Sequence, residues 1–439
     1  MQNDVKKQTL DRSVPPALHD YPDVTFEVPQ WQVLANGIRL CVVDHGDVDV
    51  CKIDVYVGGG LLEQTKRYVP MLLCHMLAKG TLHHTSDEIA EQLDFYGAKM
   101  SASVSDHCCQ ATLRCANDNL EHLMPIFNEM LTCPIFPQNE LDKLVDRIVA
   151  YAAISAQRVS VMADTCLSQM YYGKESLLAG EYDAEGARLV TTDDLRDFFN
   201  QHFAPGNCRV VVSGRVTEKV ITEVRHCVER WQNRTFPDLK PWHREPQEVG
   251  VQIVDKPDAM QTGVAIAIDA IGRSHPDYIT LRILITALGG YFGSRLMSNI
   301  REDKGYTYGI QSYLIGRGED GYIGISTECA TQYTQNVLTE IRYEMKRMRE
   351  ELIGEDELQM VRNHMLTDLM KTFDTAFAMA GYVGSTICYG VSPDYFNEQY
   401  KLVKSVTPEQ LRAVAQRYLL EENMRIALAG DAKALAEVS

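Results

Sequence analysis

The sequence predicts an α+β protein made of two similarly folded halves with antiparallel sheets. Residues 203–214 resemble residues 419–430, and their Asn, Arg and Gly positions match at an offset of 216. A repeat at about half the chain length implies two units of like fold. Strand-like and helix-like segments alternate in both halves, and the proline-dotted, polar stretch 230–258 has the composition of a linker. We therefore expect domains at residues 1–235 and 250–439.

The strands are predicted from short runs rich in β-branched and aromatic residues between turn residues. The glycine-rich stretch 316–321 lies between two of them and predicts a hairpin. The predicted strands are 37–44, 50–57, 98–104, 108–116, 208–214, 251–255, 262–269, 306–315, 321–328 and 424–430.

The helices are predicted from apolar residues spaced three and four positions apart. This spacing indicates helices at 118–131, with Asp118 as a cap, and at 335–352. Residues 85–93 predict another helix, for which Ser86 is a suitable N-cap.

A further helix is expected over residues 69–81, where Pro70 suits the first turn and Gly80 suits a C-terminal stop. On it, Met71, Cys74 and His75 occupy positions i, i+3 and i+4, so they share one face.

Several segments, in this order and spacing, resemble the insulinase-like (M16) metallopeptidase family. They are residues 34–40, 55–60, 69–81, 85–93, 97–104, 198–207 and 293–308. The resemblance covers nearly the whole chain. It implies two tandem αβ-roll domains that form a clamshell when the protein dimerises.

The family motif H-x-x-E-H binds zinc through its two His residues and activates water with its Glu. In the matching positions this sequence has Met71, Cys74 and His75. The thioether of Met71 is a poor zinc ligand, and the thiol of Cys74 is unsuited to act as the general base. These three residues are therefore interpreted as degenerate zinc-motif positions.

The third zinc ligand of the family is a Glu in a later helix, and the matching region here is 145–155. This region has no Glu, and its one carboxylate, Asp146, lies too early to take the ligand position. Catalytic zinc needs three protein ligands and an open position. We expect no metal and no catalytic residue in this chain, with zinc in a partner chain.

An alternative interpretation of the motif region is a remodelled site for a soft metal. Thiolate and imidazole ligands suit zinc or copper. Neighbouring residues diverge on a helix or strand, which weighs against this alternative. The structural alternative to a metal-ligand role for His75 is a histidine packed in the core. The candidate ligands are Cys74, His75, His83, His84, His107, Cys108 and Cys109.

Residues 293–308 resemble the substrate element of the family, in which an Arg and a Tyr seven residues later contact the backbone of the bound peptide. The matching residues are Arg301 and Tyr308. A guanidinium and a phenol can donate hydrogen bonds to a peptide carbonyl and to its developing oxyanion. Local chemistry alone favours an Arg at a helix C-terminus and a half-buried strand Tyr. The resemblance favours a substrate-binding role.

Within this family, some bacterial members divide the active site between an H-x-x-E-H chain and a chain that keeps only the Arg/Tyr pair. The sequence resembles the second kind. We expect a regulatory, peptide-binding subunit that forms a heterodimer with an H-x-x-E-H partner and supports proteolysis only in that complex. A structural or assembly role and an independent metal-dependent activity are the alternatives, and a homodimer of the isolated chain stays open.

Composition sets the remaining bounds. A net charge of −17 disfavours nucleic-acid binding. No apolar run reaches the roughly 18–20 residues that span a membrane, and residues 1–29 show no signal-peptide core. The 12 Cys are scattered without a C-x-x-C motif, which is typical of free thiols in a reducing compartment. We expect a cytoplasmic protein, or a periplasmic one if a signal peptide has been removed.

Overall fold

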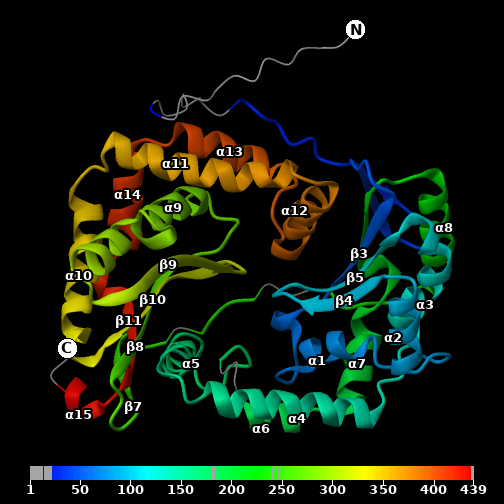
Figure 1. The fold of residues 1–439 in the computed structure, drawn as a ribbon, viewed down its shortest axis with the longest axis horizontal. Helices are drawn as coiled ribbons and strands as arrows, with labels where there is room; N and C mark the ends of the chain where they lie inside the picture. The colour runs from blue at the N-terminus through cyan, green and yellow to red at the C-terminus, as the bar shows by residue number, and fades with distance from the viewer. Residues whose placement is uncertain (1–12, 14–21, 180–182, 239–241, 246, 437–439) are drawn as a thin grey trace.

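The computed structural model describes residues 13, 22–179, 183–238, 242–245 and 247–436. Two β-sheets lie on opposite sides of the molecule, each with its own helices (Figure 1). The first sheet has the strand order β1-β2-β6-β3-β5-β4, and the second has the order β7-β11-β8-β10-β9. Most neighbouring strands are antiparallel, while β2–β6 and β7–β11 are parallel pairs. The predicted α+β class with a sheet in each half is confirmed.

Each predicted strand is present and begins and ends within two residues of the expected positions. The strands are β1 (Trp31–Val33), β2 (Arg39–Asp44), β3 (Val50–Gly58), β4 (Lys99–Val104), β5 (Cys108–Ala116), β6 (Cys208–Gly214), β7 (Gly250–Asp255), β8 (Gln261–Ile271), β9 (Thr307–Arg317), β10 (Asp320–Ala330) and β11 (Met424–Gly430). The edge strand β1 was not predicted, because three residues are too few to show an alternating pattern. The β9–β10 hairpin is tighter than expected and turns at Gly318, which has a φ of 60°.

The helices of the first half surround one face of the first sheet, apart from α5. They are α1 (Val69–Met76), α2 (Ser86–Phe95), α3 (Leu120–Thr132), α4 (Gln138–Ser155), α5 (Val159–Tyr172), α6 (Ala184–Arg188), α7 (Thr192–His202) and α8 (Glu218–Val228). The helices of the second half are α9 (Tyr278–Ile285), α10 (Thr334–Glu350), α11 (Glu355–Met370), α12 (Ala376–Tyr389), α13 (Tyr395–Ser405), α14 (Pro408–Tyr418) and α15 (Ala432–Leu435).

Three predicted helix ends were wrong. The helix α1 ends at Met76, before Gly80, which instead has a φ of 150° and forms a β-bridge with Thr85. Thr85, rather than Ser86, is the N-cap of α2, because its hydroxyl accepts from the Glu88 amide at 3.3 Å and the Glu88 carboxylate accepts from the Thr85 amide at 2.8 Å. Asp118 is not a cap, because it lies in a 3₁₀ turn before α3.

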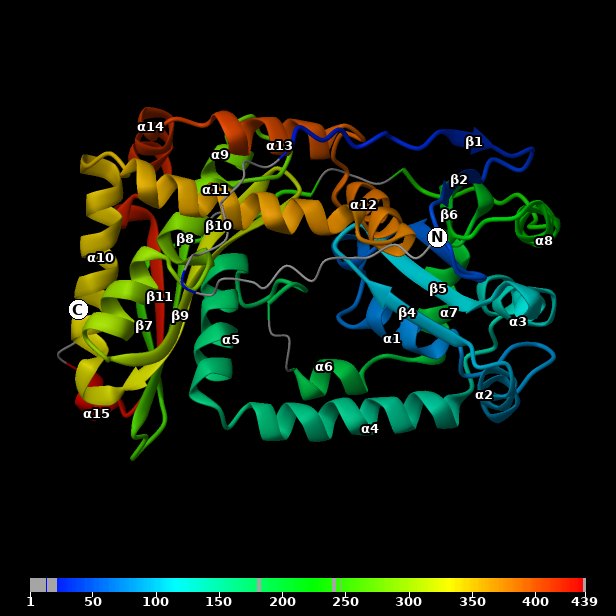
Figure 2. The ribbon, with the colours of Figure 1, turned by 45° about the horizontal axis from the view of Figure 1, so that its top comes forward.

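The two halves exchange helices. Helix α5 packs on β8 and β11 of the second sheet, whereas α12 packs on β2, β3 and β6 of the first (Figures 1 and 2). Small residues on one face of the second sheet let α5 approach closely. They are Gly263, Ala265, Ala267, Ala427 and Ala429. On the other sheet, Gly384 of α12 lies directly against the buried hydroxyl of Tyr56.

The chain before β1 ties the first half to the second. Phe26 is buried among the rings of Phe373, Tyr382 and Phe396, with centroid distances of 5.5–6.0 Å. The Asn397 side chain accepts from the Phe26 amide at 2.8 Å and donates to its carbonyl at 3.1 Å. These contacts and the exchanged helices make the two halves one interlocked body.

In the part of the chain that is described, no helix combines the length and hydropathy needed to cross a membrane.

Candidate functional site

The degenerate motif lies on α1, which packs against β4 and α7. Leu72, Leu73 and Met76 are fully buried and hold the helix in the first core. The opposite face carries Met71, which is half-buried, and His75, which is exposed. Met71 and His75 therefore share the outer face of α1, whereas Cys74 between them is buried.

Cys74, at the position of the general base, is buried and already engaged. Its thiol donates to the Ser103 carbonyl on β4 at 3.2 Å. Its hydrogen bond with Cys109 of β5, together with burial, raises the pKa of the Cys109 thiol. A thiol held against a strand in this way packs α1 onto the sheet and presents no free base.

Cations surround the one remaining histidine of the motif. Partial burial lowers the pKa of His75, and the charges of Arg147 and Lys79 lower it further. Arg147 belongs to α4, within the region that matches the third ligand of the motif. A zinc ion would meet a thioether, a bonded thiol and two cationic side chains here, so the residues present do not fit a catalytic zinc.

The other candidate metal ligands lie in separate contacts. The rings of His83 and His84 approach the Glu129 carboxylate, with Nδ1–O distances of 3.5 and 3.0 Å. Cys108 lies on the other face of the sheet, with its sulfur 2.7 Å from that of Cys388 on α12. His107 is half-buried beside Asp106 and Arg317. Among the described residues, no group of three or more His, Cys, Asp or Glu side chains is placed to hold a metal ion.

Arg301 lies on the π-helical segment η5 (Met297–Asp303), which follows α9 and contacts β9. Its guanidinium stacks on the exposed ring of Phe292 at 4.7 Å and lies 4.0 Å from the Glu302 carboxylate. The interpretation of Arg301 as an Arg near a helix C-terminus assumed an ordinary helix. The structure has a π-helix that ends at Asp303, and Gly305 has a φ of 65°.

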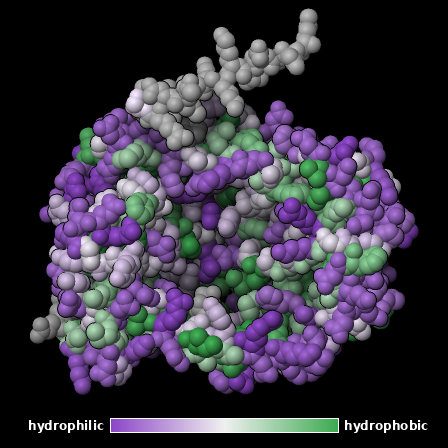
Figure 3. Space-filling model, viewed as in Figure 1, coloured by the Kyte–Doolittle hydropathy of each residue, from purple (hydrophilic) through white to green (hydrophobic). Residues whose placement is uncertain are grey.

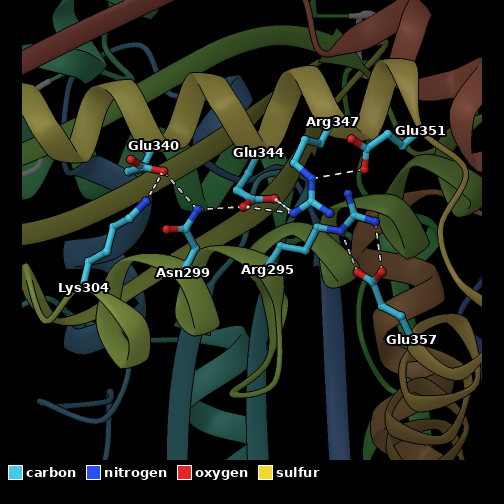
Figure 4. Close-up of polar contacts among 8 residues, drawn as sticks. All are labelled: Arg295, Asn299, Lys304, Glu340, Glu344, Arg347, Glu351 and Glu357. Carbon is cyan, nitrogen blue, oxygen red and sulfur yellow. Dashed lines mark hydrogen bonds and ion pairs between the residues drawn. The ribbon is translucent and has the colours of Figure 1, made fainter.

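A network of polar contacts fixes η5 to helix α10 and the start of α11 (Figure 4). Asn299 donates to the buried Glu344 carboxylate at 2.7 Å and to Glu340 at 3.1 Å. Arg295 forms a two-pronged pair with Glu357 at 2.7 and 2.9 Å. Because these contacts hold the backbone before and around Arg301, its position is determined by the whole helical layer.

Tyr308 is the most exposed large hydrophobic side chain of the described residues, with 94% of its surface accessible. It stands on β9, an outer strand of the second sheet, whose one partner strand among the described residues is β10. Tyr308 and Gln311 line a groove of about 680 Å³ that also reaches Arg158 and Ser160 at the start of α5. Figure 3 shows the hollowed surface between the two halves.

The structure thus presents Arg301 and Tyr308 separately. No hydrogen bond joins their side chains within the described residues, and Arg301 is not among the residues that line the groove. Sequence reasoning missed Arg147 and Phe292, which contribute a charge to the motif face and a ring to Arg301.

Two family models match the chain. Residues 41–177 match "Insulinase (Peptidase family M16)", and residues 189–365 match "Peptidase M16 inactive domain". Among curated proteins, an uncharacterized zinc protease of Streptomyces coelicolor is 24% identical over 88% of this chain and 86% of its own length. The uncharacterized zinc protease YmxG of Bacillus subtilis is 23% identical over 90% of this chain and 96% of its own length. The mitochondrial-processing peptidase subunit beta of Caenorhabditis elegans is 22% identical over 90% of this chain and 88% of its own length.

Solved structures share the fold. A peptidase M16 inactive domain from Pseudomonas fluorescens superposes with a TM-score of 0.84 at 21% identity, covering 92% of this chain and 98% of that one. A protease from Helicobacter pylori gives a TM-score of 0.81 at 17% identity, with coverages of 91% and 99%. These likenesses extend over both halves of the chain.

Proposed function

Because this chain belongs to peptidase family M16, we propose that it is a zinc-less, substrate-binding subunit that completes the peptide-cleaving site of an H-x-x-E-H partner. The observation that carries the proposal is the contrast between its two candidate sites. The motif face carries Met71 and a bonded Cys74 with two nearby cations, whereas the segment with Arg301 and Tyr308 is intact and accessible.

The accessible edge of the second sheet supports the peptide-binding part of the proposal. An extended peptide can add to the outer edge of a sheet through main-chain hydrogen bonds. Strand β9 offers such an edge, and Tyr308 projects from it into the groove. The Tyr308 hydroxyl and the Arg301 guanidinium are donors suited to a peptide carbonyl and to its oxyanion in the transition state.

The partner in the proposal supplies zinc and the general base. Relatives named as zinc proteases, and one named as a subunit of a mitochondrial processing peptidase, support an assembly of this kind. Arg301 and Tyr308 would then orient the peptide backbone at the partner's metal. Binding energy used to align the scissile bond raises the rate without any hydrolytic chemistry in this chain.

Mixing experiments test the proposal. The chain is purified alone, mixed with an H-x-x-E-H chain of similar length from the same source, and assayed with a fluorogenic peptide library. Peptide hydrolysis is expected only when both chains are present. Arg301→Ala is expected to lower kcat/KM about a hundredfold, the usual cost of removing a transition-state donor, and Tyr308→Phe about tenfold.

Arg196→Ala is the matched control, because this exposed Arg on α7 pairs with Asp193 on the same helix and lies outside both candidate sites. Size-exclusion chromatography of each mixture separates loss of assembly from loss of peptide binding. Turnover by the purified chain alone, or full activity of a mixture carrying both substitutions, would refute the proposed role.

A further inference from the structure

A second cavity of about 540 Å³ lies inside the second half, between α9, α11, α12, α13 and the middle of β9. It shares no lining residue with the groove at Tyr308. Its volume is typical of sites for small molecules. None of the residues named so far for peptide binding faces it, so its lining needs an explanation of its own.

Two arginines without carboxylate partners face this cavity. Arg282 on α9 and Arg273 in the preceding turn form no ion pair with any Asp or Glu of the described chain. Arg273 lies between two rings, 3.6 Å from the Tyr389 centroid and 5.6 Å from that of Tyr278, and its buried Nε has no hydrogen-bond partner. Arginine held in this way is a ready partner for a carboxylate or a phosphate.

Buried phenols add further donors. Tyr395 is 8% exposed, and neither its hydroxyl nor that of Tyr382 forms a hydrogen bond by geometry, although the Gln399 amide lies beside Tyr395. Burial raises the pKa of both phenols, so both stay protonated and able to donate. A buried polar atom without a partner costs free energy, and a bound acceptor would recover that cost.

The acidic groups near the cavity are either paired with a lysine or outside its lining, which leaves room for an anionic ligand. Asp368 is the acid among the lining residues, and Lys371 pairs with it at 2.6 Å. Glu398 and Asp394 are exposed and outside the lining. The rest of the lining is mixed, with the apolar side chains Ile285, Leu369 and Val403 beside polar ones such as His364, Ser385 and Gln399.

We propose that this cavity binds a small organic anion. Its carboxylate or phosphate group lies against Arg273 and Arg282 and accepts from the Tyr382 and Tyr395 hydroxyls. Its non-polar part packs against Ile285, Leu369 and Val403. The site does not depend on peptide binding at Arg301 and Tyr308, so it stands even if the proposed subunit role fails.

Binding of three aromatic probes of similar size tests the site. Phenyl phosphate and phenylacetate are anionic, while benzylamine is cationic, and each is titrated into the full chain by ligand-observed NMR and calorimetry. The two anions are expected to bind at one site and benzylamine is not. The better of the two anions distinguishes a phosphate ligand from a carboxylate ligand.

Variants locate the site. Arg282→Gln is expected to weaken anion binding at least tenfold and Tyr395→Phe several-fold, while Arg188→Gln on the distant helix α6 leaves it unchanged. Arg282 is exposed on α9, so its loss does not unfold the chain, and thermal unfolding without probe confirms that. Equal binding of benzylamine, no anion binding, or anion binding unaffected by Arg282→Gln overturns the proposal.

An independent observation concerns the thiols of Cys108 and Cys388. Their sulfur atoms are 2.7 Å apart, compared with about 2.05 Å in a disulfide. Cys108 belongs to the first sheet and Cys388 to the exchanged helix α12, and the half-buried Cys388 is the more accessible of the two. We infer that this pair is a redox-sensitive link between the two halves of the molecule.

The chemistry requires a small external disulfide such as oxidised glutathione. The Cys388 thiolate attacks it and releases one glutathione thiolate, and the Cys108 thiolate then attacks the Cys388 sulfur and releases the second. The protons of both cysteine thiols pass to the two departing thiolates. The chain is oxidised by two electrons, and one glutathione disulfide is reduced to two thiols.

Mass spectrometry after equilibration with oxidised glutathione tests this link. A loss of about 2 Da and a crosslinked peptide joining Cys108 to Cys388 are expected, reversible by dithiothreitol. The fully buried pair Cys51 and Cys115, with sulfurs 3.9 Å apart, serves as an internal control that stays reduced. A stable glutathione adduct on Cys388, or no reaction in the native chain, overturns the inference.

Discussion

At the scale of single residues, the motif positions on α1 differ from those of the family motif. The sequence predicted from side-chain identity alone that Met71 and Cys74 remove a zinc ligand and the general base. The structure adds the environment of those residues. Cys74 donates to a strand carbonyl, and the region expected to hold a third ligand instead brings the Arg147 charge close to His75. The spacing of residues in the sequence does not predict that Arg147 lies near His75, because this depends on how α4 packs against α1.

The effect of the Arg147 charge on His75 leads to a prediction at this scale. Arg147→Gln removes one of the two charges that hold the pKa of His75 below 6.5, so that pKa is expected to rise toward the value of a free imidazole. NMR titration of the imidazole resonances measures it. Lys143→Gln, on the same helix but paired with Glu140, is the control and is expected to leave the pKa of His75 unchanged.

At the scale of elements, hydrophobic periodicity predicted the strands closely and the helix interiors well. Helix ends were less predictable, since they depend on caps such as that of Thr85 rather than on periodicity. The π-helical segment at Arg301 had no sequence signal. Its extra residue per turn depends on contacts of Arg295 and Asn299 with α10 and α11, which lie far along the chain.

Removing one contact of this network is expected to loosen the segment that carries Arg301. Asn299→Ala leaves the buried Glu344 carboxylate with Arg347 alone, at a cost of about 1–3 kcal/mol in the free energy of unfolding. Hydrogen exchange across Met297–Asp303 should speed up. Gln359→Ala, which removes an exposed contact with Asn363 on α11, should change neither quantity. Unaltered exchange in Asn299→Ala would show that the network does not position η5.

At the scale of the whole molecule, the exchange of α5 and α12 makes the two repeats one interlocked body. Glycine and alanine at the two crossing points permit it. The sequence showed the repeat and the linker, but it did not show that one helix of each half packs on the sheet of the other half.

The Gly384 crossing provides a test with a matched control. Gly384→Ala places a methyl group on the Tyr56 phenol, and overpacking of this kind costs about 1–3 kcal/mol. Gly381→Ala on the same helix meets no atom within 4 Å and is expected to be neutral or stabilising, because alanine favours helix. Urea unfolding of both variants measures the difference. Equal stability would show that α12 does not need this close approach.

Acid is expected to weaken the fold. Burial lowers the pKa of His75, His107 and His202 below 6.5, so the unfolded chain binds protons before the folded chain does. Their contribution to stability is complete above pH 6.5 and is lost as the pH falls through the lowered values. For the buried His202 the loss is about 1.4 kcal/mol per unit of pKa difference. His202→Gln should flatten the loss of unfolding free energy between pH 7.5 and 5.5, and the exposed His226→Gln should not.

The sequence by itself determined the strands, the repeat, the family and the side chains at the degenerate motif positions, because each of these depends on residue identity and local periodicity. Only the tertiary structure decided the exchanged helices, the π-helical segment beneath Arg301, the charge beside His75 and the cavity lined by arginines and phenols. Those features arise where side chains distant in sequence meet, and their free energies depend on burial and distance that no local pattern encodes.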